Sequence, residues 1–290
     1  MKLILGPASQ QLGERIAQLL NAQTVPVVEK TFPDGESYTR LEGQAQDEEV
    51  VIVQTTSSQQ NTRLMQLAFM ADAAKRNGAK KVTAVVPYLA YARQDKIFLP
   101  GEAISIDTVS RMLHAAGVGR LITVNIHQAN VLDRFPFPAK TVSAIPLLAE
   151  HFKKMGFEKA FALAPDKGAM HIAEEAKAVL GGECGYLEKH RDRYSGQISM
   201  ETKKLDVKGK TAIVFDDIIS TGGTIVAAAQ ILKEFGAEKV YAACVHPLLV
   251  GDAEKRILEA GVSEIVGTDS VPGPASKVSV APLIARELAK

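Results

Sequence analysis

The amino-acid sequence predicts an α/β fold made of two related domains, each with a mostly parallel sheet flanked by helices. Two observations support this fold class. Short apolar runs rich in β-branched residues alternate along the chain with segments of helical periodicity. A pattern of strand, loop, helix and strand also occurs twice. With 290 residues, of which 46% are hydrophobic, the chain is long enough for one large or two ordinary domains.

The predicted strands are short, continuous apolar runs. Strands of this kind are buried on both faces, as in a parallel sheet covered by helices. They are expected at Lys2–Leu5, Val50–Gln54, Lys81–Pro87, Leu121–Ile126, Ala160–Ala164, Thr211–Phe215, Val240–Val245 and Glu264–Gly267.

Helices are predicted between the strands, where apolar residues recur three and four positions apart. One such set is Leu12, Ile16, Leu19 and Leu20, behind the capping residue Ser9. Several helices are expected to end at a glycine, because glycine readily adopts the left-handed conformation that closes a helix. The glycines in question are Gly78, Gly117, Gly156 and Gly236.

The chain contains an internal repeat at an offset of about 160 positions, too long for a solenoid. In the first copy VIVQTTSSQQNT and a helix precede GAKKVTAVVPYL, and in the second AIVFDDIISTGGT and a helix precede GAEKVYAACVHPLL. We expect two domains, residues 1–145 and 146–290, with the last helix packing back on the first. The alternative is a chance likeness between two βαβ units. An acidic pair and adjacent glycines occur only in the second copy, so the chemistry is expected there.

The charge balance excludes a general polyanion binder. The chain has 34 Lys plus Arg against 33 Asp plus Glu, which gives a net charge of +1 and no broad attraction for nucleic acid or a membrane surface. No apolar run reaches the length of a signal or membrane segment, so a cytoplasmic location is expected. Cys184 and Cys244 lack a CxxC partner and are expected to be buried thiols.

The stretch VFDDIISTGGT combines two acids with an anion-binding loop. Asp216 and Asp217 are predicted at the carboxyl end of a strand, where ligands bind in open α/β sheets. The loop offers hydroxyl groups and unobstructed backbone N–H groups at a helix N-terminus, a site suited to phosphate. Its residues are Ser220, Thr221, Gly222, Gly223 and Thr224, with the helix expected from Thr224. Ribose 5-phosphate fits both features, because its phosphate suits the loop and its hydroxyl groups suit the acids. An ordinary capped turn is the simpler alternative.

This stretch resembles the phosphoribosyl diphosphate binding motif of type I phosphoribosyltransferases. Three further stretches narrow the resemblance: TFPDGESYTR from residue 31, PYLAYARQDK from residue 87 and VNIHQANVLDRF from residue 124. In order and spacing, and over essentially the whole chain, the sequence resembles the ribose-phosphate pyrophosphokinase family, also called phosphoribosyl diphosphate synthetases. The resemblance implies two phosphoribosyltransferase-like domains in tandem.

The resemblance also implies an ATP site. Phe32, Asp34 and Glu36 would stack on and hydrogen-bond the adenine from a neighbouring subunit, which implies a homo-oligomer, at least a dimer. Further ATP-binding residues would be Arg93, Gln94, Asp95 and His127. Taken alone, PDG is also a good turn sequence and a lone histidine is usually a core residue.

Metal and catalytic residues are implied in the same way. Asp166, in the loop APDKGAMHIA, would help His127 to position Mg²⁺ on ATP. Lys189 and Arg191 lie on a segment expected to form a protruding hairpin, and they would close over the transferring diphosphoryl group. A solvated basic loop is the alternative for that hairpin. Many relatives have an acid where this chain has Ser220, so the role of that residue does not follow from the resemblance.

The implied reaction is attack by the 1-hydroxyl of ribose 5-phosphate on the β-phosphorus of Mg-ATP, which yields phosphoribosyl diphosphate and AMP. Two alternatives stay open. A phosphoribosyltransferase would consume phosphoribosyl diphosphate and would need no ATP site, which the FPDGE and ARQD stretches argue against. A non-catalytic regulatory subunit would have no reason to keep the acids and the basic pair.

Overall fold

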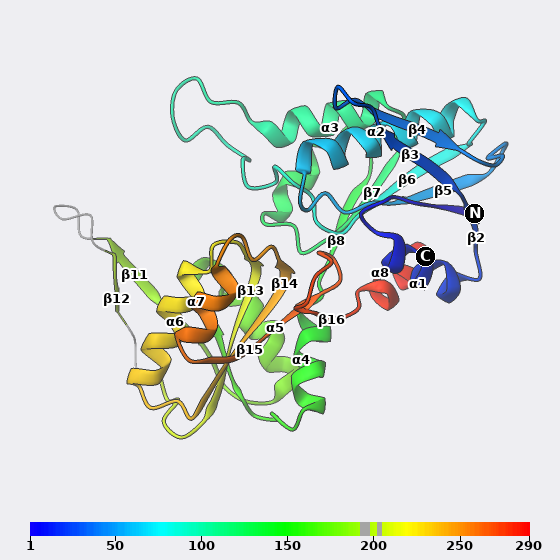
Figure 1. The fold of residues 1–290 in the computed structure, drawn as a ribbon. Coiled ribbons are helices and arrows are strands. Elements are labelled where there is room, and N and C mark those ends of the chain that lie inside the picture. The colour runs from blue at the N-terminus through cyan, green and yellow to red at the C-terminus, as the bar shows by residue number, and fades with distance from the viewer. Residues whose placement is uncertain (192–197, 202–204) are drawn as a thin grey trace. The chain divides into compact units, whose positions relative to one another are not determined.

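The computed structural model describes residues 1–191, 198–201 and 205–290. Over these residues the chain divides into two compact units (Figure 1). Unit 1 comprises Met1–Ser143, Ser270–Pro272 and Ser279–Lys290, and unit 2 comprises Ala144–Asp269 and Gly273–Val278. No helix among the described residues is both long and apolar enough to span a bilayer.

Unit 1 is built on a six-stranded parallel sheet in the order β2-β1-β5-β6-β7-β8. A separate antiparallel hairpin is formed by β3 and β4. The strands are β1 (Lys2–Leu5), β2 (Gln23–Val25), β3 (Val27–Thr31), β4 (Ser37–Leu41), β5 (Glu49–Val53), β6 (Lys81–Val86), β7 (Arg120–Val124) and β8 (Ala139–Val142). The helices are α1 (Gln10–Leu20), α2 (Gln60–Arg76), α3 (Ser105–Ala115), η1 (Ala129–Arg134) and α8 (Ala281–Leu288).

Unit 2 is built on a second six-stranded parallel sheet in the order β10-β9-β13-β14-β15-β16. It also carries an antiparallel hairpin, formed by β11 and β12. The strands are β9 (Phe161–Ala164), β10 (Cys184–Tyr186), β11 (Glu188–Arg191), β12 (Ile198–Glu201), β13 (Thr211–Ile219), β14 (Lys239–Pro247), β15 (Val262–Thr268) and β16 (Ser276–Val278). The helices are α4 (Ile145–Lys154), η2 (Lys167–Ala169), α5 (Met170–Leu180), α6 (Gly223–Glu234) and α7 (Ala253–Glu259).

The internal repeat is confirmed by the topology. Both large sheets have the same order, with β9, β10, β13, β14, β15 and β16 in the places of β1, β2, β5, β6, β7 and β8. The pairing also aligns the two central strands residue by residue. Glu49 pairs with Lys81 where β5 meets β6, and Thr211 pairs with Lys239 where β13 meets β14. Glu49 and Thr211 therefore occupy equivalent positions.

Helices cover both faces of β13, which fixes its register. Val214 belongs to a buried cluster that includes Ile225 and Leu232 of α6. The next residue, Phe215, faces the other way and its ring packs edge-on against Phe152 of α4, with centroids 6.3 Å apart. Because successive side chains of a strand point to opposite faces, a shift by one residue would turn Val214 toward α4 and Phe215 toward α6, and neither would fit the packing there. This packing determines where the acidic pair emerges.

The predicted strands are present, and the largest difference lies in β13. The sequence predicted an end at Phe215, but β13 continues to Ile219, so Asp216 and Asp217 lie within the strand. The reason is that β14 is equally long and pairs with β13 as far as Pro247. Short strands at the edges of the sheets and the β3–β4 hairpin were not predicted, because such short segments have little apolar periodicity.

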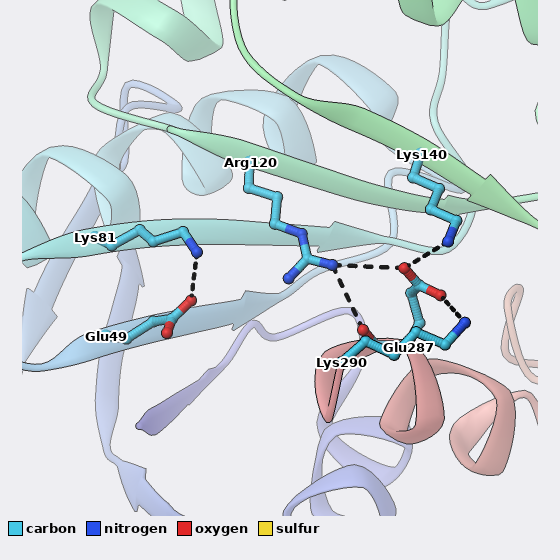
Figure 2. A network of polar contacts seen from close by, with 6 residues as sticks. All are labelled: Glu49, Lys81, Arg120, Lys140, Glu287 and Lys290. Atoms are coloured by element: carbon cyan, nitrogen blue, oxygen red, sulfur yellow. Dashed lines mark hydrogen bonds and ion pairs between the residues drawn. The ribbon is translucent and has the colours of Figure 1, made fainter.

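The last helix, α8, belongs to unit 1, where it packs against α1. Glu287 fixes it to the sheet through a network of cations (Figure 2). Its carboxylate lies 2.8 Å from Lys140 Nζ, 2.9 Å from Lys290 Nζ and 3.5 Å from Arg120 Nη2, and its side chain is only 6% exposed. The hydrogen bond from Lys140 holds the pKa of Glu287 below its usual value, so the carboxylate is ionised at neutral pH.

Candidate active site

The acidic pair lies at the carboxyl edge of the unit 2 sheet. On one side β13 pairs with β9 only as far as Val214, opposite Leu163. On the other side β13 continues along β14, where Asp216 pairs with Cys244. The backbone of Asp216 and Asp217 therefore extends past the end of β9. Both side chains are half-buried at this edge.

The acids repel one another in a poorly solvated place. The pKa of Asp216 is raised well above its usual value, chiefly by burial and then by the charge of Asp217, with a further contribution from Asp166. The backbone N–H of Asp217 donates to Asp216 Oδ1 at 2.9 Å, which compensates only in part. A cation or several hydroxyl donors would relieve this repulsion.

Asp166 lies near the acidic pair because β9 and β13 are neighbours. It follows β9 after one intervening residue, Pro165, and caps the short η2 helix, with its Oδ1 accepting a hydrogen bond from the Ala169 N–H at 3.2 Å. Its negative charge adds to the raised pKa of Asp216. Across the described residues, no group of three or more His, Cys, Asp or Glu side chains is close enough to form a metal centre.

The loop after β13 leads directly into α6, which begins at Gly223 rather than at the expected Thr224. Gly222 caps the helix with a φ of 78°, a conformation that L side chains rarely adopt. A Cβ at Gly222 would also lie 2.8 Å from Cδ1 of Ile257, whereas one at Gly223 would meet open space. The N–H groups of the first turn of a helix have no intrahelical partners, and the helix dipole makes that end attractive to anions. The loop thus has the features of a phosphate site.

Lys189 and Arg191 lie on β11, in the segment expected to form a hairpin. They pair with Met200 and Ile198 of β12. The side chains of both residues lie outside the described part of the structure. Their predicted catalytic role stays a prediction.

In unit 1, Phe32, Asp34 and Glu36 lie on the turn between β3 and β4. The turn is closed by the Phe32 N–H, which donates to the Glu36 carbonyl at 2.8 Å, and by Gly35 at a φ of 95°. All three side chains are exposed, with Phe32 at 41%. The ring of Phe32 packs edge-on against Tyr38. The turn therefore carries an exposed aromatic ring and two exposed carboxylates.

The remaining predicted ATP residues follow two neighbouring strands of unit 1. Arg93 and Gln94, both exposed, and the half-buried Asp95 come after β6, and the exposed His127 comes after β7. The carboxyl ends of parallel neighbours meet at one edge of the sheet. Arg134, in η1, joins the two segments by donating to the Asp95 carbonyl at 2.6 Å.

The unit 1 copy of the acidic site carries no acids. Counted from the aligned positions Glu49 and Thr211, Gln54 replaces Asp216 and Thr55 replaces Asp217.

Both of these unit 1 residues are fully buried and are used within the fold. Gln54 Oε1 accepts a hydrogen bond from the Ala8 N–H at 3.1 Å, and Thr55 Oγ1 donates to the Ser270 carbonyl at 2.7 Å. This filling supports the expectation that the chemistry belongs to unit 2.

Sequence reasoning missed two residues that contact the site's backbone. Cys244 is buried as expected, whereas Cys184 is only half-buried. The sulfur of Cys244 accepts a hydrogen bond from the Ile219 N–H at 3.1 Å. Arg256 donates to the Thr221 carbonyl at 2.5 Å. Nothing in the sequence indicates these contacts. Cys244 has the pattern of a buried core thiol, and Arg256 that of an exposed ion pair within a helix.

The duplicated parallel sheet, with an acidic pair and a glycine-containing loop in one copy, defines a phosphoribosyltransferase-like α/β protein. Two family models match: the N-terminal domain of ribose phosphate pyrophosphokinase over residues 1–117, and the phosphoribosyl synthetase-associated domain over residues 200–285. The chain belongs to the ribose-phosphate pyrophosphokinase family.

Similarity to individual proteins extends over the whole chain. The chain is 45% identical to the ribose-phosphate pyrophosphokinase of Methanobrevibacter smithii, and the match covers 99% of each chain. It is 44% identical to that of Methanothermobacter thermautotrophicus, covering 98% of each. The crystal structure of phosphoribosylpyrophosphate synthetase from Mycobacterium smegmatis matches with a TM-score of 0.89 and 31% identity, covering 99% of this chain and 97% of that one. The predicted family and the predicted tandem fold are both confirmed.

Proposed function

We propose that this chain transfers the β,γ-diphosphoryl group of Mg-ATP to the 1-hydroxyl of ribose 5-phosphate, giving phosphoribosyl diphosphate and AMP. Membership of the family supports this reaction. The observation that carries it is the pairing of half-buried acids with a phosphate-type loop at one edge of the unit 2 sheet.

Ribose 5-phosphate binds at both of its ends. Its phosphate accepts hydrogen bonds from the N–H and hydroxyl groups of Ser220, Thr221, Gly222, Gly223 and Thr224. Its ribose hydroxyls donate to Asp216 and Asp217, which relieves the repulsion between the two carboxylates. Residues 146–290 therefore hold the sugar phosphate, and residues 1–145 carry the ATP elements.

The residues present suit a magnesium ion. Carboxylate oxygens are the hard ligands that Mg²⁺ prefers, and the charges of Asp217 and Asp166 both raise the pKa of Asp216, which a cation would reverse. We propose that Asp166 and His127 help to hold the ion on ATP, where it would neutralise charge on the phosphates.

Adenine binds on the β3–β4 turn. The exposed ring of Phe32 offers a stacking surface, and the carboxylates of Asp34 and Glu36 accept hydrogen bonds from the amino group. Arg93 and Gln94 bind phosphate and ribose groups, with Asp95 beside them, and the Arg fork suits a phosphate. We propose that the turn serves the site of a neighbouring subunit, so the working enzyme is at least a homodimer.

Positioning and charge neutralisation account for catalysis, because phosphoryl transfer needs little covalent help from the protein. Lys189 and Arg191 stabilise the charge that builds on the transferred group. The direct test mixes the protein with Mg²⁺, ATP and ribose 5-phosphate and measures AMP by chromatography. AMP formed in proportion to phosphoribosyl diphosphate is the expected result. A protein that makes no AMP but joins a nucleobase to phosphoribosyl diphosphate, releasing diphosphate, would be a transferase instead.

A further inference from the structure

The phosphate loop is held from one side by a single stretch of chain. We call residues 249–257 the support segment; it follows β14 and includes most of α7. Three successive carbonyls, those of the last residue of β13 and the first two residues of the loop, accept hydrogen bonds from it. The pairs are Leu249 N–H to Ile219 O at 3.0 Å, Val250 N–H to Ser220 O at 3.0 Å, and Arg256 Nη2 to Thr221 O at 2.5 Å.

These contacts set the direction of the loop's N–H groups. In a trans peptide unit the carbonyl of one residue and the N–H of the next point in opposite directions. Because the three carbonyls point toward the support segment, the N–H groups of Ser220, Thr221 and Gly222 point away from it. The N–H groups of the first turn of α6, which begins at Gly223, come next along the chain and extend this run of donors. A run of N–H groups aimed to one side is the arrangement that binds an anion.

Packing closes the gap between loop and support segment at Gly222. A Cβ there would lie 2.8 Å from Cδ1 of Ile257 and 3.5 Å from Cβ of Ala253, so the loop backbone rests directly on α7. The contacts of Leu249 and Val250 come from the backbone and persist with any side chain. Arg256 is the point at which the support depends on the side chain.

Arg256 is itself held in place. Its Nε lies 2.9 Å from Asp252 Oδ1, one helical turn earlier, and its side chain is 44% exposed. The other end of the guanidinium reaches the Thr221 carbonyl. A charged donor polarises the peptide unit that it bonds, which strengthens the N–H of Gly222 as a donor.

We propose that Arg256 is a positioning residue for ribose 5-phosphate: it fixes the Thr221–Gly222 peptide so that the loop amides face the phosphate. This role rests on the proposed function of the loop. Arg256 acts through the loop backbone and does not touch the substrate.

The test compares Arg256→Met with Lys255→Met. Lys255 is the adjacent residue on α7, its side chain is 75% exposed, and its only described ion pair is a 3.8 Å contact with Glu259, so its loss removes the same charge without touching the loop. We expect Arg256→Met to raise the KM for ribose 5-phosphate about tenfold, with the KM for ATP unchanged. Arg256→Lys should recover part of the loss, and Lys255→Met should match the parent protein.

A second measurement separates positioning from direct contact. In the ligand-free protein, amide hydrogen exchange at Leu249 and Val250, whose N–H groups donate to the carbonyls of Ile219 and Ser220, should be faster in Arg256→Met than in Lys255→Met. A raised KM with unchanged exchange would make Arg256 a direct phosphate ligand and overturn the proposal. An equal effect in both variants would also overturn the proposal, because loss of one positive charge anywhere on α7 would then explain the result.

The outcomes for the proposed function are distinct. If calorimetry detects no binding of ribose 5-phosphate to the parent protein with Mg²⁺ and a non-hydrolysable ATP analogue, the function and this inference both fail. If the parent binds and Arg256→Met binds equally well, the inference alone fails.

Discussion

Gly222 is the residue at which the loop geometry should be hardest to change. We predict that Gly222→Ala destabilises unit 2 strongly, whereas Gly223→Ala leaves it intact. Gly222 combines a φ of 78° with a Cβ direction that points into Ile257. Gly223 has neither feature, because it lies in α6 and a Cβ would meet nothing within 4 Å.

Two contributions give the size of the effect. An L residue forced into the left-handed region costs roughly 1–2 kcal/mol. A Cβ placed 2.8 Å from Ile257 Cδ1 must displace that side chain or the loop, and overpacking of this kind costs about 1–3 kcal/mol. Gly222→Ala should therefore lower the free energy of unfolding by about 2–5 kcal/mol. Gly223→Ala should change it by no more than about 0.5 kcal/mol.

Urea unfolding followed by circular dichroism measures both variants. The steric part can be isolated with Ile257→Val, which removes the Cδ1 atom nearest to the new methyl group. The double variant should lose less stability than the sum of the single changes, by about 1 kcal/mol. Equal stabilities of Gly222→Ala and Gly223→Ala would refute the reasoning, and strict additivity with Ile257→Val would remove its steric part.

Three further predictions follow from the described contacts and the proposed roles. Glu287→Gln should lower the free energy of unfolding by only about 1 kcal/mol at pH 7, because its partner Lys140 is partly exposed. The pKa of Glu287 is lowered in the folded protein, so its stabilising contribution is complete above the ordinary carboxyl pKa of 4.5 and is lost as the pH falls below it. The urea midpoints of parent and variant should therefore converge in acid. Asp216→Asn should raise the melting temperature by about 2–4 °C, because a carboxyl group with a raised pKa destabilises the fold when it is ionised. The same variant should bind ribose 5-phosphate more weakly in calorimetry, and a lower melting temperature would contradict the prediction. Changing Lys189 and Arg191 together to Ala should reduce kcat by about 10³-fold or more with ribose 5-phosphate binding retained, and an unchanged kcat would remove this hairpin from the mechanism.

The fold was predictable where the sequence carries a strong pattern. The runs around Val51, Ala84 and Val214 are short, mostly apolar and rich in β-branched residues, which favours buried strands over helices. The repeat followed from comparing these runs within one chain. The edge strands β2 and β10 are only three residues long, and their pairing depends on partners distant in sequence. No local window could contain that information.

The candidate site also combines features that are local in sequence with contacts between distant elements. The acids, the glycines and the loop hydroxyls are consecutive in sequence, so the stretch that ends at Thr224 could be interpreted from residue types alone. The extension of β13 past Phe215 could not, because it depends on how far β14 accompanies it. Arg256 and Cys244 reach the loop from elements later in the chain, and their contacts became visible only when β13, β14 and α7 were seen together.

The two copies of the sheet allow the acidic pair to be compared with uncharged residues at the same positions of the fold. At equivalent positions, unit 1 has Gln54 and Thr55, whose polar groups are bonded within the fold, and unit 2 has Asp216 and Asp217. The same sheet topology therefore forms without acids at these positions, so the fold itself does not require them. In unit 2 burial and mutual repulsion make the ionised pair unfavourable. A carboxylate pair that weakens its own domain is explained when a ligand compensates it, and hydroxyl donors and a cation, the ligand groups of the proposed reaction, are the compensation that this edge of the sheet can accept.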